Sequence, residues 1–181
     1  GVDVLTRAAD AGSLAEYDAV VVATGARPRE LALPGAEHAV HALDGGAASA
    51  VVVGGGFVGT ETALRLAEDG AHVTLVEAGD ELMRGDVITD RITYGERLEA
   101  AGVHVLTGTA VVAVRDGGVT LADGRELSAE RVVAAVGRSS ERGLADDLLR
   151  AGVEVHVIGD AASPGRIHDA VHSAYSLARR L

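Results

Sequence analysis

The chain contains no cysteine and no tryptophan among its 181 residues, and aromatic side chains make up only 2% of it. Without cysteine it can form no disulfide framework, no redox-active cysteine pair, no cysteine-ligated cluster and no thiolate zinc site. Since 48% of the residues are nonetheless hydrophobic, the core must be built from Val, Leu and Ala. The 24 glycines and the valine-rich runs fit buried parallel strands that are joined by tight turns.

Positive charge is also scarce, because 16 Lys and Arg residues face 27 Asp and Glu residues, which gives a formal net charge of −11. This sign of charge argues against a nucleic acid or an anionic membrane as partner. No apolar run reaches the roughly 20 residues that a membrane span needs, and no signal-peptide pattern opens the chain. We therefore expect a cytoplasmic protein.

Three glycines follow a run of β-branched residues near the middle of the chain. Gly54, Gly56 and Gly59 come directly after Val51–Val53, and a segment with helical periodicity continues to Gly70. The order strand, G-x-G-x-x-G, helix is the context that a dinucleotide-binding fingerprint requires. In this reading Gly54 permits the tight turn, Gly56 lets a pyrophosphate approach the backbone, and Gly59 lets the helix pack closely on the strand.

A second predicted strand, His72–Val76, ends in Glu77. An acid about 20 residues past the glycines bonds the adenosine ribose hydroxyls in this fingerprint. Glu77 would repel a 2′-phosphate, which favours NAD(H) over NADP(H), although Arg84 a few residues later weakens that preference. Phe57 and Val58, at the start of the helix, complete the predicted nucleotide site. A glycine-rich turn in some other α/β protein is the alternative.

The segment after Glu77 predicts one helix and further strands. Helical periodicity over Thr89–Ala101 is taken to put Ile92 and Leu98 on one side, with Gly102 as a C-cap, and Val103–Leu106 reads as a strand. Asp-Gly pairs then predict the turns of an antiparallel meander. Its three short strands are Ala110–Val114, Gly118–Leu121 and Arg125–Leu127.

The flanking parts of the chain contain one internal repeat. Ala19–Arg27 and Arg131–Arg138 are both buried strands that run into a glycine turn and an arginine, as expected where a chain leaves a domain and returns to it.

The chain starts inside a predicted strand without an initiator Met, so we expect a fragment of a longer protein. The remaining expectations are a strand at 1–5, a loop or short helix at 36–49, a polar connection at 139–152, a strand at 153–160 that ends in Gly-Asp, and a helix at 166–181 with an apolar stripe of Ile167, Ala170, Val171, Ala174, Leu177 and Ala178.

Four motifs in order now make the pattern specific: Val-Val-Val-Ala-Thr-Gly at 20–25, the glycine fingerprint, Val-Ala-Ala-Val-Gly-Arg at 133–138, and Val-Ile-Gly-Asp-Ala at 157–161. This set resembles the two-dinucleotide flavoprotein reductases, which are similar in fold to glutathione reductase. The segment Ile158–His172 is similar to the C-terminal part of the old-yellow-enzyme-like NADH:flavin oxidoreductases, the group with 2,4-dienoyl-CoA reductase and trimethylamine dehydrogenase.

The resemblance implies roles for matching residues. Asp160 stands where the family's Asp bonds the FAD ribityl chain, and Glu61 matches an acid that approaches the nicotinamide. From the residues alone, Asp160 could equally be a helix N-cap, and Glu61 an exposed acid in the first turn of a helix. The other residues that we assign to cofactor binding on this basis are Thr24, Gly25, Gly137 and Gly159.

The resemblance also implies a domain plan. It predicts an α/β fold in which a Rossmann-like NAD(P)-binding domain, a parallel sheet plus β-meander at residues 50–128, is inserted in a partial FAD-binding domain of the same type at 1–49 and 129–181. The family's FAD fingerprint, and the N-terminal barrel with FMN and a 4Fe–4S cluster, would precede residue 1. By itself the chain is then expected to lack the substrate chemistry.

The predicted function is a nucleotide-binding fragment of a flavin-dependent NADH oxidoreductase that positions NADH for hydride transfer to FAD. One alternative is a structural adenine-nucleotide module, as in amine dehydrogenases of this group, and another is a ferredoxin reductase or NADH oxidase. His168 and His172, four residues apart on a helix, could bind zinc, but no third ligand suggests itself. An incomplete FAD domain would expose an unpaired sheet edge, and such an edge favours association with a second copy of the chain. A homo-oligomer is therefore a further expectation.

Overall fold

A computed structural model describes residues 1–41 and 47–181. The part of the expected loop or helix at 36–49 that falls on residues 42–46 lies outside this description. The chain forms two compact units: Gly1–Arg27 with Arg138–Leu181, and Pro28–Gly137. We call them the split unit and the central unit. The central unit extends beyond the expected 50–128, because strands on both sides of that range pair into its sheet.

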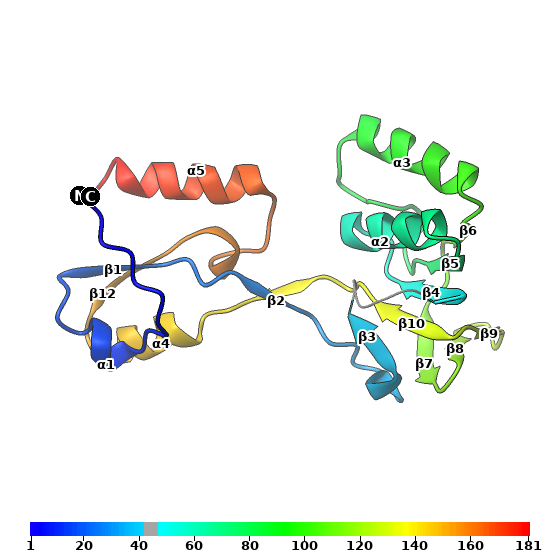
Figure 1. The fold of residues 1–181 in the computed structure, drawn as a ribbon, viewed down its shortest axis with the longest axis horizontal. Helices are drawn as coiled ribbons and strands as arrows, with labels where there is room; N and C mark the ends of the chain where they lie inside the picture. Colours follow the sequence, from blue (N-terminus) through cyan, green and yellow to red (C-terminus); the bar gives the residue numbers. More distant parts are fainter. Residues whose placement is uncertain (42–46) are drawn as a thin grey trace. The chain divides into compact units, whose positions relative to one another are not determined.

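The central unit is built on a five-stranded parallel sheet with the order β3-β10-β4-β5-β6 (Figure 1). The helix α2 (Phe57–Glu68) connects β4 to β5, and α3 (Ile88–Ala100) connects β5 to β6. This is the β-α-β order that the valine runs and glycine fingerprint predict. The strands are β3 Ala39–His41, β10 Arg131–Ala134, β4 Ser49–Val53, β5 His72–Val76 and β6 His104–Leu106.

Both faces of this sheet are buried, which explains the unbroken apolar run in β4. Side chains alternate between the faces of a strand, and those of Ala50 and Val52 pack with the residues of α2 and α3. The side chains of Val51 and Val53 point the other way and pack against the antiparallel meander. The predicted meander is thus confirmed as a separate three-stranded sheet of β7 Val111–Arg115, β8 Gly118–Leu121 and β9 Glu126–Ser128.

The expected inward face of α3 is wrong in one residue. Leu98 is only 1% exposed, whereas Ile92 is 55% exposed. Six residues correspond to a rotation of about 240° in a helix with 3.6 residues per turn, so the two side chains leave different sides. The expected C-terminus is confirmed, because Gly102 follows the last turn with a φ of 72°.

The split unit has a smaller core between two parallel strands and a helix. Strand β1 (Ala19–Val22) pairs with β12 (Glu154–Val157), and α4 (Gly143–Arg150) packs against them through Ala145 and Leu148. A polar connection was expected at 139–152, and that expectation is wrong. The acidic residues of this segment favoured the prediction of a polar connection, but they lie on an amphipathic helix whose apolar side chains face the core.

Three further segments of the split unit differ from expectation or complete the path. Residues 1–5 form no strand, and no described strand pairs with them. The stripe on α5 (Ile167–Ala178) is largely exposed, and Leu177 is its buried residue. The remaining elements are α1 Ala11–Leu14, β2 Ala26–Pro28, η1 Ala36–His38, β11 Arg138–Ser140 and η2 Gly159–Ala161.

The two places where the chain passes between the units lie side by side, because β2 pairs with β11. The repeated glycine turns lie next to these strands, and both glycines have positive φ, 80° at Gly25 and 100° at Gly137. Within residues 1–41 and 47–181, no helix combines the length and apolar character needed to cross a membrane.

The register of α3 predicts a contrast between two substitutions. Leu98→Ala should lower the free energy of unfolding by about 2–5 kcal/mol, because it removes a buried side chain and leaves a cavity. Ile92→Ala, on the exposed side of the same helix, should change it by less than about 0.5 kcal/mol. Urea unfolding followed by circular dichroism measures both. Equal losses for the two variants would contradict this register.

Candidate functional site

The turn after β4 brings two backbone segments into direct contact. Gly54 has a φ of 107°, and a Cβ there would lie 2.5 Å from the carbonyl oxygen of Ala135. A Cβ on Gly59, in the first turn of α2, would lie 1.8 Å from the carbonyl oxygen of Gly54. Only glycine fits at either position, so these two residues perform the turning and packing roles that the fingerprint predicts.

Gly56 differs from these two glycines, because an added Cβ would meet no atom within 4 Å. It is the N-cap of α2 and offers no side-chain oxygen to the first turn of the helix. The N–H groups and the dipole at a helix N-terminus attract anions. The open space beside Gly56 therefore suits the close approach of a phosphate to the backbone.

Glu77 follows β5, and both oxygens of its carboxylate accept hydrogen bonds from the backbone. One oxygen accepts a hydrogen bond from the backbone N–H of Gly55 at 2.6 Å, and the other accepts one from Gly79 at 2.7 Å. Sequence reasoning missed both glycines. The sequence did carry a signal for Gly55, because it is the middle of three successive glycines. The structure gives the reason for a glycine there: a Cβ would lie 2.8 Å from that of Glu77. The carboxylate is thus fixed beside the glycine loop.

A cavity of about 700 Å³ runs along the glycine loop and lies entirely within the central unit. The structure brings together here six residues that the sequence reading assigned to cofactor binding: Gly54, Gly56, Phe57, Val58, Glu77 and Gly137. Sequence reasoning missed the apolar walls from residues 29–33 and from the start of the meander, since neither segment carries a binding motif. These walls include Leu31, Leu33, Ala110 and Val111, and Val136, which follows β10, adds to them.

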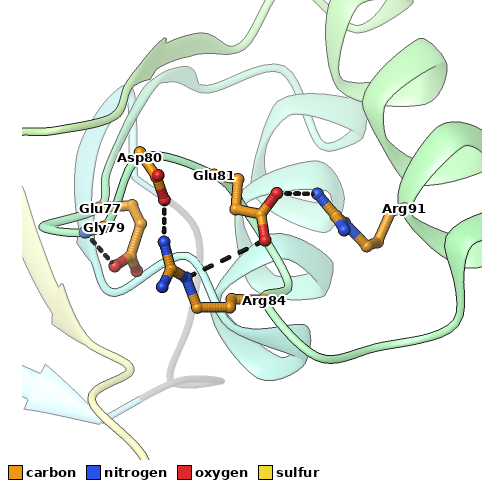
Figure 2. A network of polar contacts seen from close by, with 6 residues as sticks. All are labelled: Glu77, Gly79, Asp80, Glu81, Arg84 and Arg91. Carbon is orange, nitrogen blue, oxygen red and sulfur yellow. Dashed lines mark hydrogen bonds and ion pairs between the residues drawn. The ribbon is translucent and has the colours of Figure 1, made fainter.

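A second cavity, of about 440 Å³, adjoins Glu77 on the β5–α3 connection. Gly55, Gly56 and Glu77 line it together with Arg84. As Figure 2 shows, Arg84 forms ion pairs with Asp80 and Glu81. The guanidinium that could favour a 2′-phosphate is therefore already paired with two acids.

Glu61 lies away from the loop cavity, in a groove between α2 and α3. It is not in the first turn of α2, so the alternative of a first-turn acid is wrong. Its carboxylate accepts a hydrogen bond from the hydroxyl of Tyr94 at 2.8 Å, and this bond raises the pKa of Tyr94 above its ordinary value. The ring of Tyr94 also packs edge-on against Phe57, with centroids 5.5 Å apart.

Asp160, in the split unit, forms a closed set of contacts. Its carboxylate pairs with Arg138 at 2.5 Å and accepts the N–H of Gly165 at 2.9 Å, while Arg138 also donates to the Gly165 carbonyl. The N-caps of the neighbouring helices are Ile158 and Arg166. Asp160 is therefore no N-cap, which removes that alternative.

The other predicted residues of the split unit have structural contacts. Thr24 donates its hydroxyl to the carbonyl of Glu141 at 2.6 Å, and the carbonyl of Gly25 accepts the N–H of Glu141 at 2.9 Å. Gly159 has a φ of 58° and donates its N–H to the hydroxyl of Ser173 at 3.0 Å. These bonds hold the turns after β1 and β12 in place.

The imidazole rings of His168 and His172 lie on one side of α5, with centroids 4.3 Å apart. His168 is 3.3 Å from Asp169. In the part of the chain that the structure describes, no group of three His, Cys, Asp or Glu residues could hold a metal ion. The pair thus has no third ligand within that part.

The parallel sheet, glycine turn and meander define an α/β protein of the Rossmann-like dinucleotide-binding class. The family model described as pyridine nucleotide-disulphide oxidoreductase matches residues 2–161. The chain belongs to this family of FAD/NAD(P)-binding oxidoreductases.

Relatives support this assignment over most of the chain. The NADH oxidase of Thermoanaerobacter brockii is 35% identical over 190 residues, which cover 94% of this chain and 29% of that protein. Among solved structures, a 2-naphthoyl-CoA reductase complex aligns with a TM-score of 0.85 at 25% identity, covering 96% of this chain and 28% of the other. Histamine dehydrogenase from Rhizobium sp. 4-9 aligns with a TM-score of 0.77 at 25% identity, covering 96% and 30%. The chain thus spans less than a third of the length of these proteins.

The Glu61–Tyr94 bond predicts a change in tyrosine titration. Glu61→Gln should lower the pKa of Tyr94 toward its ordinary value of about 10, because the charged acceptor is lost. Since the pKa is raised in the folded state, the bond's contribution to stability is complete below pH 10 or so and is lost as the pH rises through the folded-state pKa. Ultraviolet titration of the tyrosinate band measures the shift, with Tyr94→Phe to assign it among the three tyrosines. Identical curves for wild type and Glu61→Gln would show that this bond is absent in solution.

Proposed function

We propose that the chain is the nucleotide-binding part of a flavin-dependent NADH oxidoreductase and positions NADH for hydride transfer to FAD. The observation that carries the proposal is that the glycine turn, the N-terminus of α2 and Glu77 all line the cavity of about 700 Å³. These are the three groups that a dinucleotide needs for its pyrophosphate and adenosine ribose. The likeness to an NADH oxidase supports the choice of cofactor.

The residues of the central unit divide the binding of NADH among them. The space beside Gly56 admits the pyrophosphate, and the helix N-terminus favours its charge. Glu77 has two oxygens and about four acceptor sites, so its bonds to two backbone N–H groups leave capacity for ribose hydroxyls. Its negative charge would repel a 2′-phosphate, which favours NADH over NADPH. The side chains of Leu31 and Leu33 give the rest of the cavity an apolar wall.

The split unit would contribute to the FAD site. Thr24 and Gly25 form one backbone turn after β1, and Gly159 and Asp160 form another after β12. Gly137, assigned to cofactor binding as well, lines the cavity of the central unit instead. In the bound state the nicotinamide supplies the hydride and the flavin accepts it, while the protein orients the two.

The likeness to 2-naphthoyl-CoA reductase and histamine dehydrogenase supports assignment to the narrower old-yellow-enzyme-like group. In that case FMN, a 4Fe–4S cluster and the substrate site belong to a part of the protein outside these 181 residues.

Gly56→Val tests the nucleotide site without disturbing the fold. The added side chain meets no protein atom at its Cβ but fills the space assigned to the pyrophosphate, so NADH affinity should fall by at least about 100-fold, the loss expected when charge-assisted bonds are broken. Calorimetric titration measures the dissociation constant. Gly95→Val, on α3, is the matched control, because its Cβ also meets no atom. Unchanged affinity in Gly56→Val would overturn the proposed function.

A structural adenine-nucleotide site is the second candidate, favoured by the likeness to histamine dehydrogenase. It predicts that ADP binds as tightly as NADH, because only the adenosine and phosphates would be held. A working NADH site predicts that NADH binds at least about tenfold more tightly, by about 1.4 kcal/mol. Parallel titrations with NADH, NADPH, ADP and FAD separate the two candidates. Binding of none of them would contradict both.

A further inference from the structure

The β5–α3 connection carries a linked set of charged side chains beside the proposed ribose site (Figure 2). Arg84 pairs with Asp80 through its terminal nitrogen, and its Nε lies 4.0 Å from a Glu81 oxygen. The other oxygen of Glu81 pairs with Arg91 at the start of α3. The two acids therefore hold Arg84 from two sides, and Arg91 anchors one of the acids to the helix.

The backbone keeps this set next to the cavity. Met83, directly before Arg84, is 2% exposed and has a φ of 51°, a conformation that is rare for a residue with a side chain. Its N–H donates to the carbonyl of Gly55 at 2.8 Å. The connection is thus tied to the glycine loop, and Arg84 lines the same cavity as Glu77.

Arginine at this place is the residue type that accepts a 2′-phosphate, because its planar fork matches phosphate oxygens. Here its charge is already balanced. The side-chain bond from Arg84 lowers the pKa of the Asp80 carboxyl, and Asp80 raises that of Arg84 in turn. With Glu77 and Glu81 included, three carboxylates face the two guanidinium groups of Arg84 and Arg91.

We propose that Asp80 and Glu81 are positioning residues for cofactor selectivity, which exclude NADP(H) by keeping the guanidinium of Arg84 paired, so that it does not bind a ribose 2′-phosphate. This proposal rests on the proposed function, since it assumes that the dinucleotide lies along the glycine loop. It adds that rejection of the 2′-phosphate depends on the pairing of Arg84 as well as on the charge of Glu77. Arg84 is then a latent phosphate ligand.

The experiment measures dissociation constants for NADH and NADPH by calorimetry with the whole chain. Asp80→Asn should free the guanidinium and raise NADPH affinity by about tenfold, the lower end of what a hydrogen bond to a charged group contributes. NADH affinity should change by less than about threefold, within the range of a surface substitution. Glu81→Gln, which removes the longer contact, should give a smaller gain.

Two further variants separate pairing from simple loss of negative charge. Asp80→Asn with Arg84→Gln should lose the NADPH gain, because the ligand for the phosphate is gone. Asp69→Asn is the matched control: Asp69 pairs with Arg65 at the same i,i+4 spacing, 3.6 Å apart on α2, and this substitution should leave the NADPH-to-NADH ratio unchanged. The gain in Asp80→Asn should also shrink at high salt, since it is electrostatic.

The outcomes distinguish this proposal from the proposed function. If wild type binds NADH but Asp80→Asn leaves the NADPH-to-NADH ratio unchanged, the positioning role is overturned and the NADH site stands. A gain that persists in the double variant also overturns it, because Arg84 is then not the ligand. If wild type binds neither nucleotide, the proposed function fails, and the selectivity proposal fails with it.

Discussion

The close approach of α2 to the end of β4 is the contact on which the central unit depends. A Cβ at Gly59 would lie 1.8 Å from the carbonyl oxygen of Gly54, so the helix can begin this near the sheet only because that atom is missing. The same approach directs the helix N-terminus toward the loop cavity and lets Leu64 and Leu66 join the core over β4 and β5. Packing and the proposed phosphate site therefore share one cause.

The second constraint is local electrostatics in a chain of net charge −11. An anionic dinucleotide would be repelled by the protein as a whole, so binding must come from oriented backbone N–H groups at the glycine loop. The acids near the loop all have partners, because Glu77 is bonded to backbone N–H groups and Asp80 and Glu81 are paired with arginines. Negative charge at this site is thus concentrated at Glu77, Asp80 and Glu81, to which we assign the ribose contact and the choice of cofactor as proposals.

The repeated strand–glycine–arginine motif has a structural counterpart at the passage between the two units. The carbonyl of Gly25 accepts a bond from Glu141, and that of Gly137 accepts one from Arg29, both at 2.9 Å. In each case the donor is the residue that directly follows β11 or β2, so both bonds lie beside the β2–β11 pair. The two turns are similar in sequence and also similar in structural role, since each fixes the position of one of the two connections between the units by a backbone hydrogen bond.

The sequence by itself determined the β4–α2–β5 unit, the meander and the place of Glu77, because glycine spacing, Asp-Gly turns and strand periodicity are local signals. Only the tertiary structure decided that Ile92 faces outward, that residues 143–150 form a helix, and that Asp160 pairs with Arg138 and caps no helix. It also revealed the apolar walls of the cavity and the pairing of Arg84. These features depend on which distant segments of the backbone come into contact, and those contacts cannot be read from the local order of residue types.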